Sequence, residues 1–207
     1  MKKILIIFAL LVIPAFSCFA GDFYSNIVVL STESGKMLPV LLQMGITAFY
    51  AIKNNIGVIY EEKIDDQDIG YGINLASEIS QKLNTTVFYS TNHDSDVLVV
   101  FVYKNGEELF FYNSNPGYFE GENTPPAIKN IDQLLLAYNS INKEEFLNIL
   151  TTEEIFSEDI HRKIIEKLNL PEYSVDVGYN TLKCMDKSDI EEILENEYEI
   201  KIERIGK

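Results

Sequence analysis

The pattern of apolar and polar positions first predicts strands. Residues 97–103 (VLVVFVY) are apolar at every position, which is typical of a strand covered on both faces. Asn105 and Gly106 follow, and this pair predicts a tight hairpin because both residues tolerate positive φ. Residues 107–112 would then return as the partner strand. Further stretches rich in strand-forming residues are 26–31, 87–90 and 47–60, the last with a turn at Asn54-Asn55.

Helical spacing dominates later in the chain. Leu75, Ile79 and Leu83 recur every four residues and form one helical stripe. Asn142 with Glu145 forms a capping box, which marks the start of another helix. The helices predicted from spacing and caps lie within residues 34–45, 73–84, 131–138, 142–150, 157–168 and 188–194.

The remaining segments are predicted from composition. Residues 61–72 are acidic without apolar periodicity and are expected to form a loop. Residues 113–126 are dense in turn formers, which indicates a surface loop or a border between two subregions. Residues 173–182 are compatible with a strand, and alternation at 198–202 predicts an edge strand.

The order of these elements indicates the fold class. Strands mixed with one or two helices come first, and a run of helices follows. This order favours an α+β fold over a doubly wound parallel sheet. We expect a mixed, largely antiparallel sheet with helices packed on it and a helical C-terminal half, forming a single domain over residues 21–207.

The first twenty residues resemble a secretory signal peptide. Lys2 and Lys3 precede the apolar residues 4–16, which are too few for the roughly 20 that a spanning helix needs. Removal of residues 1–20 after Ala20 predicts export to the periplasm or the medium. The alternative is cleavage before Cys18, with lipidation of Cys18 anchoring the protein at the cell envelope.

Charge and cysteine content narrow the possible partners. The chain has 17 Lys and Arg against 32 Asp and Glu, a net charge of −15. Such a surface repels nucleic acid and suits solubility, cations or a basic partner. If Cys18 leaves with the signal, Cys184 has no disulfide partner. We expect it to be a small buried apolar residue, and the alternative is a reactive thiol.

The segment NHDSD at residues 92–96 is the main candidate for chemistry. In extended backbone Asn92, Asp94 and Asp96 would point to one side and His93 to the other. A calcium loop of the EF-hand type is excluded, because the positions that need Gly and Glu hold Val and Tyr. The alternative interpretation is a polar turn that bonds local backbone groups.

Other candidates are weaker. Asp65, Asp66 and Asp68 form an acidic loop that could join residues 92–96 if the fold brings them together. His161 lies near the start of a predicted helix, where we expect a solvent-facing or capping role. No paired spacing marks a metal site, and no motif indicates a nucleotide, a cofactor or a catalytic nucleophile.

Several of these motifs recur in a similar order in an uncharacterised family of bacterial proteins, which the chain resembles over roughly residues 47–180. The motifs are DQD at 66–68, HDSDVL at 93–98, YKNGE at 103–107, YNSNPGYF at 112–119 and H-x6-L-x-LP at 161–171. The resemblance implies an α+β domain and supplies no catalytic residues, since the family has no established activity. Many of its members lack a secretion signal, which differs from this chain.

We interpret the chain as an exported, acidic binding or interaction protein whose ligand is an unknown protein or small molecule. The hairpin at Asn105-Gly106 should bring NHDSD close to NPGYF, where aromatic side chains offer contact area. The candidate binding residues are Asn92, His93, Asp94, Asp96, Tyr112, Asn113, Tyr118 and Phe119. The alternatives are a hydrolase or cation-assisted enzyme using His93 with Asp94 or Asp96, and a structural component of the cell envelope.

Overall fold

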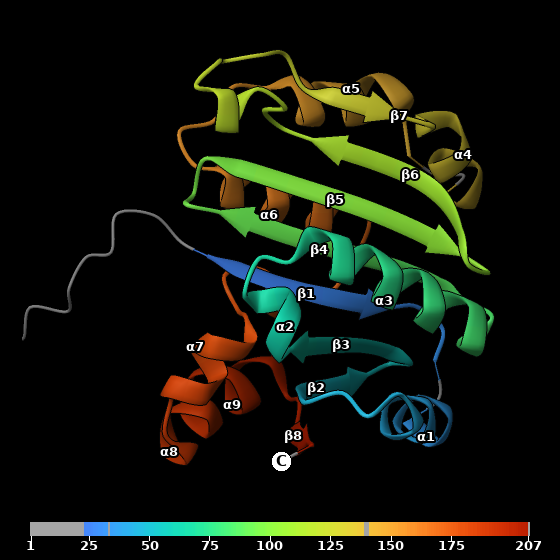
Figure 1. Ribbon diagram of the computed structural model, residues 1–207, viewed down its shortest axis with the longest axis vertical. Helices are drawn as coiled ribbons and strands as arrows, with labels where there is room; N and C mark the ends of the chain where they lie inside the picture. Colours follow the sequence, from blue (N-terminus) through green and yellow to red (C-terminus); the bar gives the residue numbers. More distant parts are fainter. Residues whose placement is uncertain (1–22, 33, 139–140, 207) are drawn as a thin grey trace, which may run out of the picture.

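The computed structural model describes residues 23–32, 34–138 and 141–206. The predicted signal peptide and the alternative prediction, lipidation of Cys18, concern residues outside these ranges. In the described chain eight strands form one sheet in the order β7-β6-β5-β4-β1-β3-β2-β8, with antiparallel pairing throughout (Figure 1). The strands are β1 (Tyr24–Val29), β2 (Ala48–Lys53), β3 (Ile56–Glu61), β4 (Thr86–His93), β5 (Val97–Lys104), β6 (Glu107–Asn113), β7 (Ala127–Lys129) and β8 (Ile202–Ile205).

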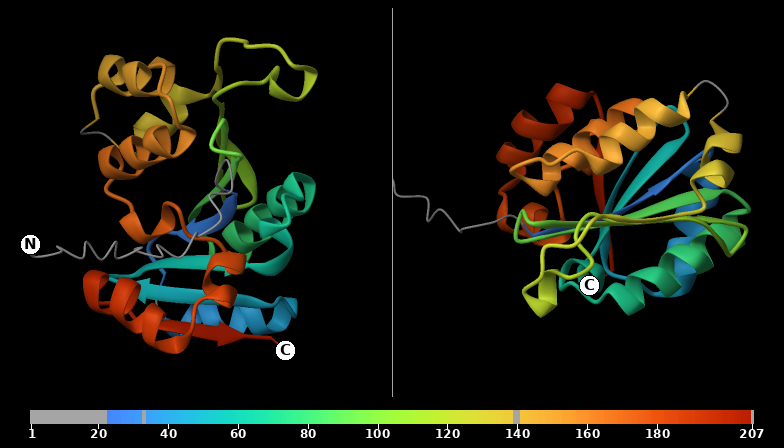
Figure 2. Two further views of the ribbon diagram at one scale, coloured as in Figure 1. Left: turned by 90° about the vertical axis from the view of Figure 1, so that its left-hand side faces the viewer. Right: turned by 90° about the horizontal axis from the view of Figure 1, so that it is seen from above.

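Helices cover both faces of the sheet (Figure 2). One face carries α1 (Ser34–Met44), α2 (Glu62–Asp65) and α3 (Ile69–Leu83). The other carries α4 (Ile131–Ala137), α5 (Lys143–Thr151), α6 (Ser157–Lys167), η2 (Glu172–Ser174), α7 (Tyr179–Cys184), α8 (Lys187–Asp189), η3 (Ile190–Glu195) and α9 (Asn196–Tyr198). The α+β fold is therefore confirmed. None of the described helices is both long and apolar enough to span a bilayer.

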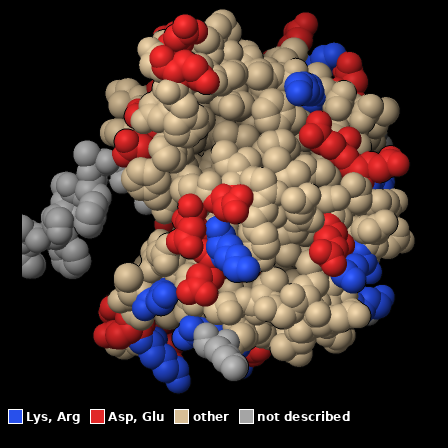
Figure 3. Space-filling model, in the orientation of Figure 1, with Lys and Arg blue, Asp and Glu red and all other residues tan. Residues whose placement is uncertain are grey.

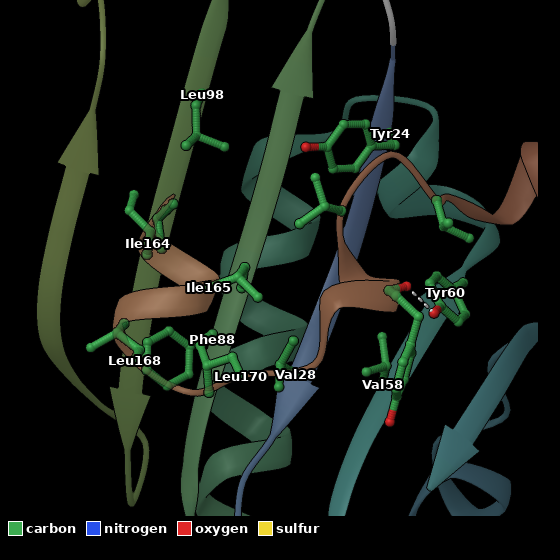
Figure 4. Packing of buried hydrophobic residues seen from close by; sticks show 14 of the residues in the cluster. Tyr24, Val28, Val58, Tyr60, Phe88, Leu98, Ile164, Ile165, Leu168 and Leu170 are labelled. Atoms are coloured by element: carbon green, nitrogen blue, oxygen red, sulfur yellow. Dashed lines mark hydrogen bonds between the residues drawn. The ribbon is translucent and has the colours of Figure 1, made fainter. Parts of the chain in front are cut away.

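Strand β5 has a buried side chain at every apolar position, as its sequence predicts. Leu98, Val100 and Val102 enter the core beneath α6, in the same cluster as Ile164 and Ile165 of that helix (Figure 4). The alternate residues Val97, Val99, Phe101 and Tyr103 enter the core beneath α3. Burial of one such aliphatic side chain contributes about 1.5–3 kcal/mol, so this strand is held from both sides.

The two predicted hairpins are confirmed. Asn54 and Asn55 have φ values of 52° and 63°, and Asn105 and Gly106 have 53° and 87°. A third tight turn joins β4 to β5, with φ values of 56° and 57° at Asp94 and Ser95. Strand β4 therefore continues to His93, beyond the predicted end at residue 90, because its backbone pairs with β5 up to Val97.

Three segments differ from their predictions. The edge strand predicted at residues 198–202 is observed as β8 from Ile202, because Tyr198 ends α9 and Glu199 adopts a left-handed φ of 50°. Residues 62–65 and 69–72 are helical rather than a loop, with a turn at residues 66–68 between them. The Glu61 carboxylate accepts from the N–H groups of α2, and Asp68 caps α3. Residues 173–182 form η2 and α7 rather than a strand. The buried Asn26 amide donates to the carbonyls of Ser174 and Val177, at 2.5 Å and 3.1 Å, and fixes this irregular segment against β1.

The predicted positions of His161 and Cys184 are wrong. His161 is 1% exposed and lies on the inner face of α6, and Cys184 is exposed at the end of α7. The imidazole stacks on Tyr24 with 5.7 Å between ring centroids, and Nδ1 shares a hydrogen bond of 2.8 Å with its hydroxyl. Burial, with a smaller effect of Arg162, lowers the pKa of His161 to about 3.

This buried imidazole predicts a pH-dependent stability. The unfolded ring titrates near 6.5, so the unfolded state binds the extra proton first and the folded protein loses stability as pH falls toward 3. The stability advantage of the wild type over His161→Gln should shrink by about 2 kcal/mol between pH 7 and pH 5. Urea unfolding of both proteins at pH 7 and pH 5 measures this change. The buried carboxylates are present in both proteins, so their titration cancels when the two free energies of unfolding are subtracted. A constant difference would show that the folded state accepts a charged His161.

Candidate functional site

The tip of the β4–β5 hairpin lies at one end of the sheet, beside the start of β1 and the 113–126 loop (Figure 1). We call this end of the sheet, with residues 91–97, Phe23 and residues 113–126, the rim. The 113–126 loop contains η1 (Tyr118–Glu120). The strands on both sides of this loop belong to the same sheet, because β7 pairs with β6.

The alternation of β4 separates Asn92 from His93. Asn92 is completely buried on the α6 side, where its Oδ1 accepts from the hydroxyl of Ser157. The carboxylate of Glu158 accepts from Ser95 Oγ at 2.8 Å and from Asn92 Nδ2 at 3.4 Å. The N–H of Ser157 donates to the carbonyl of Ser95 at 2.8 Å. Asn92 thus attaches the first turn of α6 to the hairpin and presents no surface for a ligand.

His93 faces the opposite side and lies among aromatic rings. The ring centroids of Phe23, Phe119 and Tyr118 lie 4.9, 5.0 and 5.8 Å from that of His93, all with edge-to-face geometry. Phe119 is 67% exposed and Phe23 is 45% exposed. The predicted contact between the NHDSD and NPGYF segments is therefore present, and it forms an exposed aromatic cluster.

Asp94 and Asp96 interact with Tyr118 rather than with His93. The Tyr118 hydroxyl lies 3.0 Å from Asp96 Oδ2 and 3.5 Å from Asp94 Oδ2. The hydrogen bond to Asp96 is the largest of the effects that raise the pKa of Tyr118. In the described chain neither carboxylate is hydrogen-bonded to His93, so the pairing of His93 with Asp94 or Asp96 that the enzyme alternative uses is not present.

The three aspartates of residues 65–68 do not join the rim. Asp65 is buried and accepts from the N–H groups of Ser25 and Asn180, at 2.8 Å and 2.7 Å. This carboxylate links the start of β1 to the first turn of α7, and burial raises its pKa. Asp66 is exposed, and Asp68 caps α3 by accepting from the N–H of Tyr71 at 2.9 Å.

Gln67 is the residue of this segment that reaches the rim. Its φ of 65° is uncommon for glutamine and turns the side chain toward the sheet. The amide donates to Ser25 Oγ at 3.3 Å, accepts from Thr91 Oγ1 at 3.2 Å, and lies 3.4 Å from His93 Nδ1. No periodicity or charge pattern marks Gln67, Thr91 or Phe23, and sequence reasoning missed all three.

A small pocket opens beside this network. Its volume is about 170 Å³, and most of its surface is apolar. Val97 and Val99 from β5 form the floor, and His93 stands at its edge. The pocket is completed by Ile69, Phe119, Gln67 and Thr91. An apolar group could enter it beneath Phe119, with the amide and hydroxyl at its side. We call it the rim pocket.

A larger cleft of about 610 Å³ lies on the other side of the hairpin. Its walls are residues 114–115 and 123–126 on one side and 151–155 on the other, and Asp96 stands at its end. Tyr112 lies at its base, fully buried, and donates from its hydroxyl to the Leu150 carbonyl at 3.1 Å. Asn113 is half-buried, and its Oδ1 accepts from the N–H of Asn115 at 3.0 Å. Tyr112 therefore belongs to the core.

The fold and the rim define an acidic α+β protein with two concave sites on opposite faces of one hairpin. Comparisons with family models, with curated proteins and with solved structures found no match. The resemblance to a bacterial family stays a prediction. Among the described residues, no group of three or more His, Cys, Asp or Glu side chains is arranged to hold a metal ion.

The two roles within NHDSD predict different effects on stability. Asn92→Ala should lower the free energy of unfolding by about 2 kcal/mol, because it leaves the buried Ser157 hydroxyl without its acceptor. Asp96→Asn, at an exposed position of the same hairpin, should change it by less than about 0.5 kcal/mol. Equilibrium unfolding in urea compares the two variants. Equal effects would contradict the structural role of Asn92.

Proposed function

We propose that this chain is an exported acidic binding protein whose rim pocket takes a compact apolar group of a protein or small-molecule ligand. The observation that carries the proposal is Phe119, which is 67% exposed directly at the edge of an apolar pocket. A large aromatic side chain left in solvent beside a concave apolar surface is typical of an interaction site.

The rim pocket combines apolar side chains with a few polar groups, and such a combination can fix the orientation of a ligand. Burial of one aliphatic or aromatic group against Val97 and Val99 would contribute about 1.5–3 kcal/mol. The Gln67 amide and the Thr91 hydroxyl stand at the wall and offer hydrogen-bonding atoms to a polar substituent. Phe119 lines the pocket, and Phe23 packs against the ring of its lining residue His93, so both would add aromatic contact area for a ligand.

The surface charge limits the kinds of ligand that the proposed site would bind. The net charge of −15 disfavours nucleic acid. At the rim, acidic side chains occupy the upper left of the molecule in Figure 3, where the 113–126 loop lies, and no Lys or Arg colours that area. The enzyme alternative lacks a supporting geometry, because Asp94 and Asp96 bind Tyr118 instead of orienting His93.

Small-molecule mimics of side chains test the rim pocket. Isoamyl alcohol and p-cresol should bind with millimolar dissociation constants, and their NMR shift changes should centre on the methyl groups of Val97 and Val99. Ile69→Phe, at the pocket wall, should fill the space and weaken binding at least fivefold. Ile73→Phe makes the same change one turn along α3, away from the pocket, and should leave binding within twofold.

Thermal unfolding of both variants checks that the fold is retained. Shift changes that spread over the whole surface, or that persist unchanged in Ile69→Phe, would remove the pocket as the binding site.

Export is tested on the mature protein. Intact-mass and N-terminal analysis of protein purified from its native host should find a chain beginning at Gly21, released from the cells. A chain that begins with a lipid-modified Cys18 would support the envelope-anchored alternative. A chain that retains Met1–Ala20 inside the cell would contradict export altogether.

A further inference from the structure

The large cleft is open to ligands from one side and closed by the core on the other. Tyr112, Ser157 and Ile160 lie at its base and are at most 6% exposed. Its two walls come from the 113–126 loop and from the connection between α5 and α6. At about 610 Å³ the cleft has room for several side chains of a ligand.

Four of the hydroxyls that line the cleft offer a ligand acceptor atoms only. The hydroxyls of Thr151 and Thr152 donate to the carbonyls of Leu147 and Asn148, which leaves only their lone pairs for a ligand. The hydroxyls of Thr124 and Ser157 also donate within the protein, to Asn115 Oδ1 and Asn92 Oδ1. A ligand that supplies hydrogen-bond donors can therefore bind at these four positions, while Ser114, Asn115 and Asn123 of the lining can also donate.

The charged groups of the lining have one sign. Asp96, Glu153 and Glu154 line the cleft, and none of its lining residues is Lys or Arg. Glu154 is paired with Lys163. In the described chain Asp96 and Glu153 have no ion-pair partner, and both are exposed. The electrostatic complement of this lining is a cation that donates several hydrogen bonds.

Exposed apolar side chains accompany one wall of the same cleft. Ile155 lines the cleft and is 84% exposed, and Phe156, the next residue in the chain, is 52% exposed. A simple metal ion or a small polar cation would leave these side chains in solvent. A peptide that carries both a basic and an apolar residue would use the carboxylates and the exposed apolar pair together.

We infer that the cleft between residues 114–126 and 151–155 docks a basic peptide segment of a partner protein. An arginine of the segment lies between Asp96 and Glu153, and a neighbouring apolar residue packs on Ile155 and Phe156. Arginine suits this lining better than lysine, because its planar guanidinium offers five donors to acceptors on several sides. The cleft and the rim pocket lie on opposite faces of the hairpin, so this inference does not rest on the rim pocket.

A labelled synthetic peptide with two arginines flanked by leucines tests the inference by fluorescence anisotropy on the mature chain. The peptide should bind, and Asp96→Asn with Glu153→Gln should weaken binding about tenfold. The matched control is Glu144→Gln with Glu166→Gln, which changes the net charge equally at exposed positions outside the cleft and should stay within twofold. A peptide with citrulline in place of arginine keeps the shape without the charge and should bind at least tenfold more weakly.

Three results would overturn the inference: no binding at millimolar protein, equal weakening by the control pair, or equal affinity for the citrulline peptide. Spermine is a further comparison. If it binds as tightly as the peptide and loses the same affinity in the Asp96→Asn, Glu153→Gln variant, the cleft is a site for small polycations instead of a peptide. If the double variant unfolds, Glu153→Gln alone replaces it in the binding test, because Glu153 is exposed and its substitution should leave the fold intact. Ile69→Phe should leave peptide binding unchanged, so failure of the rim pocket and failure of the cleft are distinguishable.

Discussion

The structure depends on the burial of β5 on both faces. Leu98 and its alternate residues pack beneath α6, while Val97 and Val99 pack beneath α3. Antiparallel pairing with β4 and β6 satisfies the backbone groups of the strand on both edges. A strand held in this way leaves little freedom at its ends. The hairpin that precedes it is therefore a rigid support for the side chains of the rim.

The β4–β5 hairpin has different roles on the two faces of the sheet. On the α6 side, Asn92 and Ser95 hold the first turn of the helix through Ser157 and Glu158, and this attachment forms part of the base of the cleft. On the α3 side, His93 contacts exposed aromatic rings and borders the rim pocket. Tyr118 connects the two sides, because its ring contacts His93 while its hydroxyl reaches Asp96 at the end of the cleft.

Buried polar groups explain most of the differences from the sequence predictions. His161 follows an apolar stripe on α6, but only the fold shows that the aromatic ring of Tyr24 lies opposite it. Asp65 resembles any acidic loop residue until the N–H groups of Ser25 and Asn180 are placed around it. The side chains of His161 and Asp65 are polar, so the sequence suggests that they are exposed. The groups that bind them in the core lie at least 40 residues away in the chain. Local pattern alone does not reveal them.

The sequence by itself determined the α+β class, the doubly covered strand at residues 97–103, the hairpins at Asn54-Asn55 and Asn105-Gly106, and the helices at 131–138, 142–150, 157–168 and 188–194. These features follow from side-chain periodicity and from the backbone freedom of Asn and Gly, which are local properties. Only the tertiary structure decided which face each residue of NHDSD occupies, and that Gln67 rather than an aspartate reaches His93. Those outcomes depend on strand register and on long-range hydrogen bonds, which form only when segments distant in the chain are packed together.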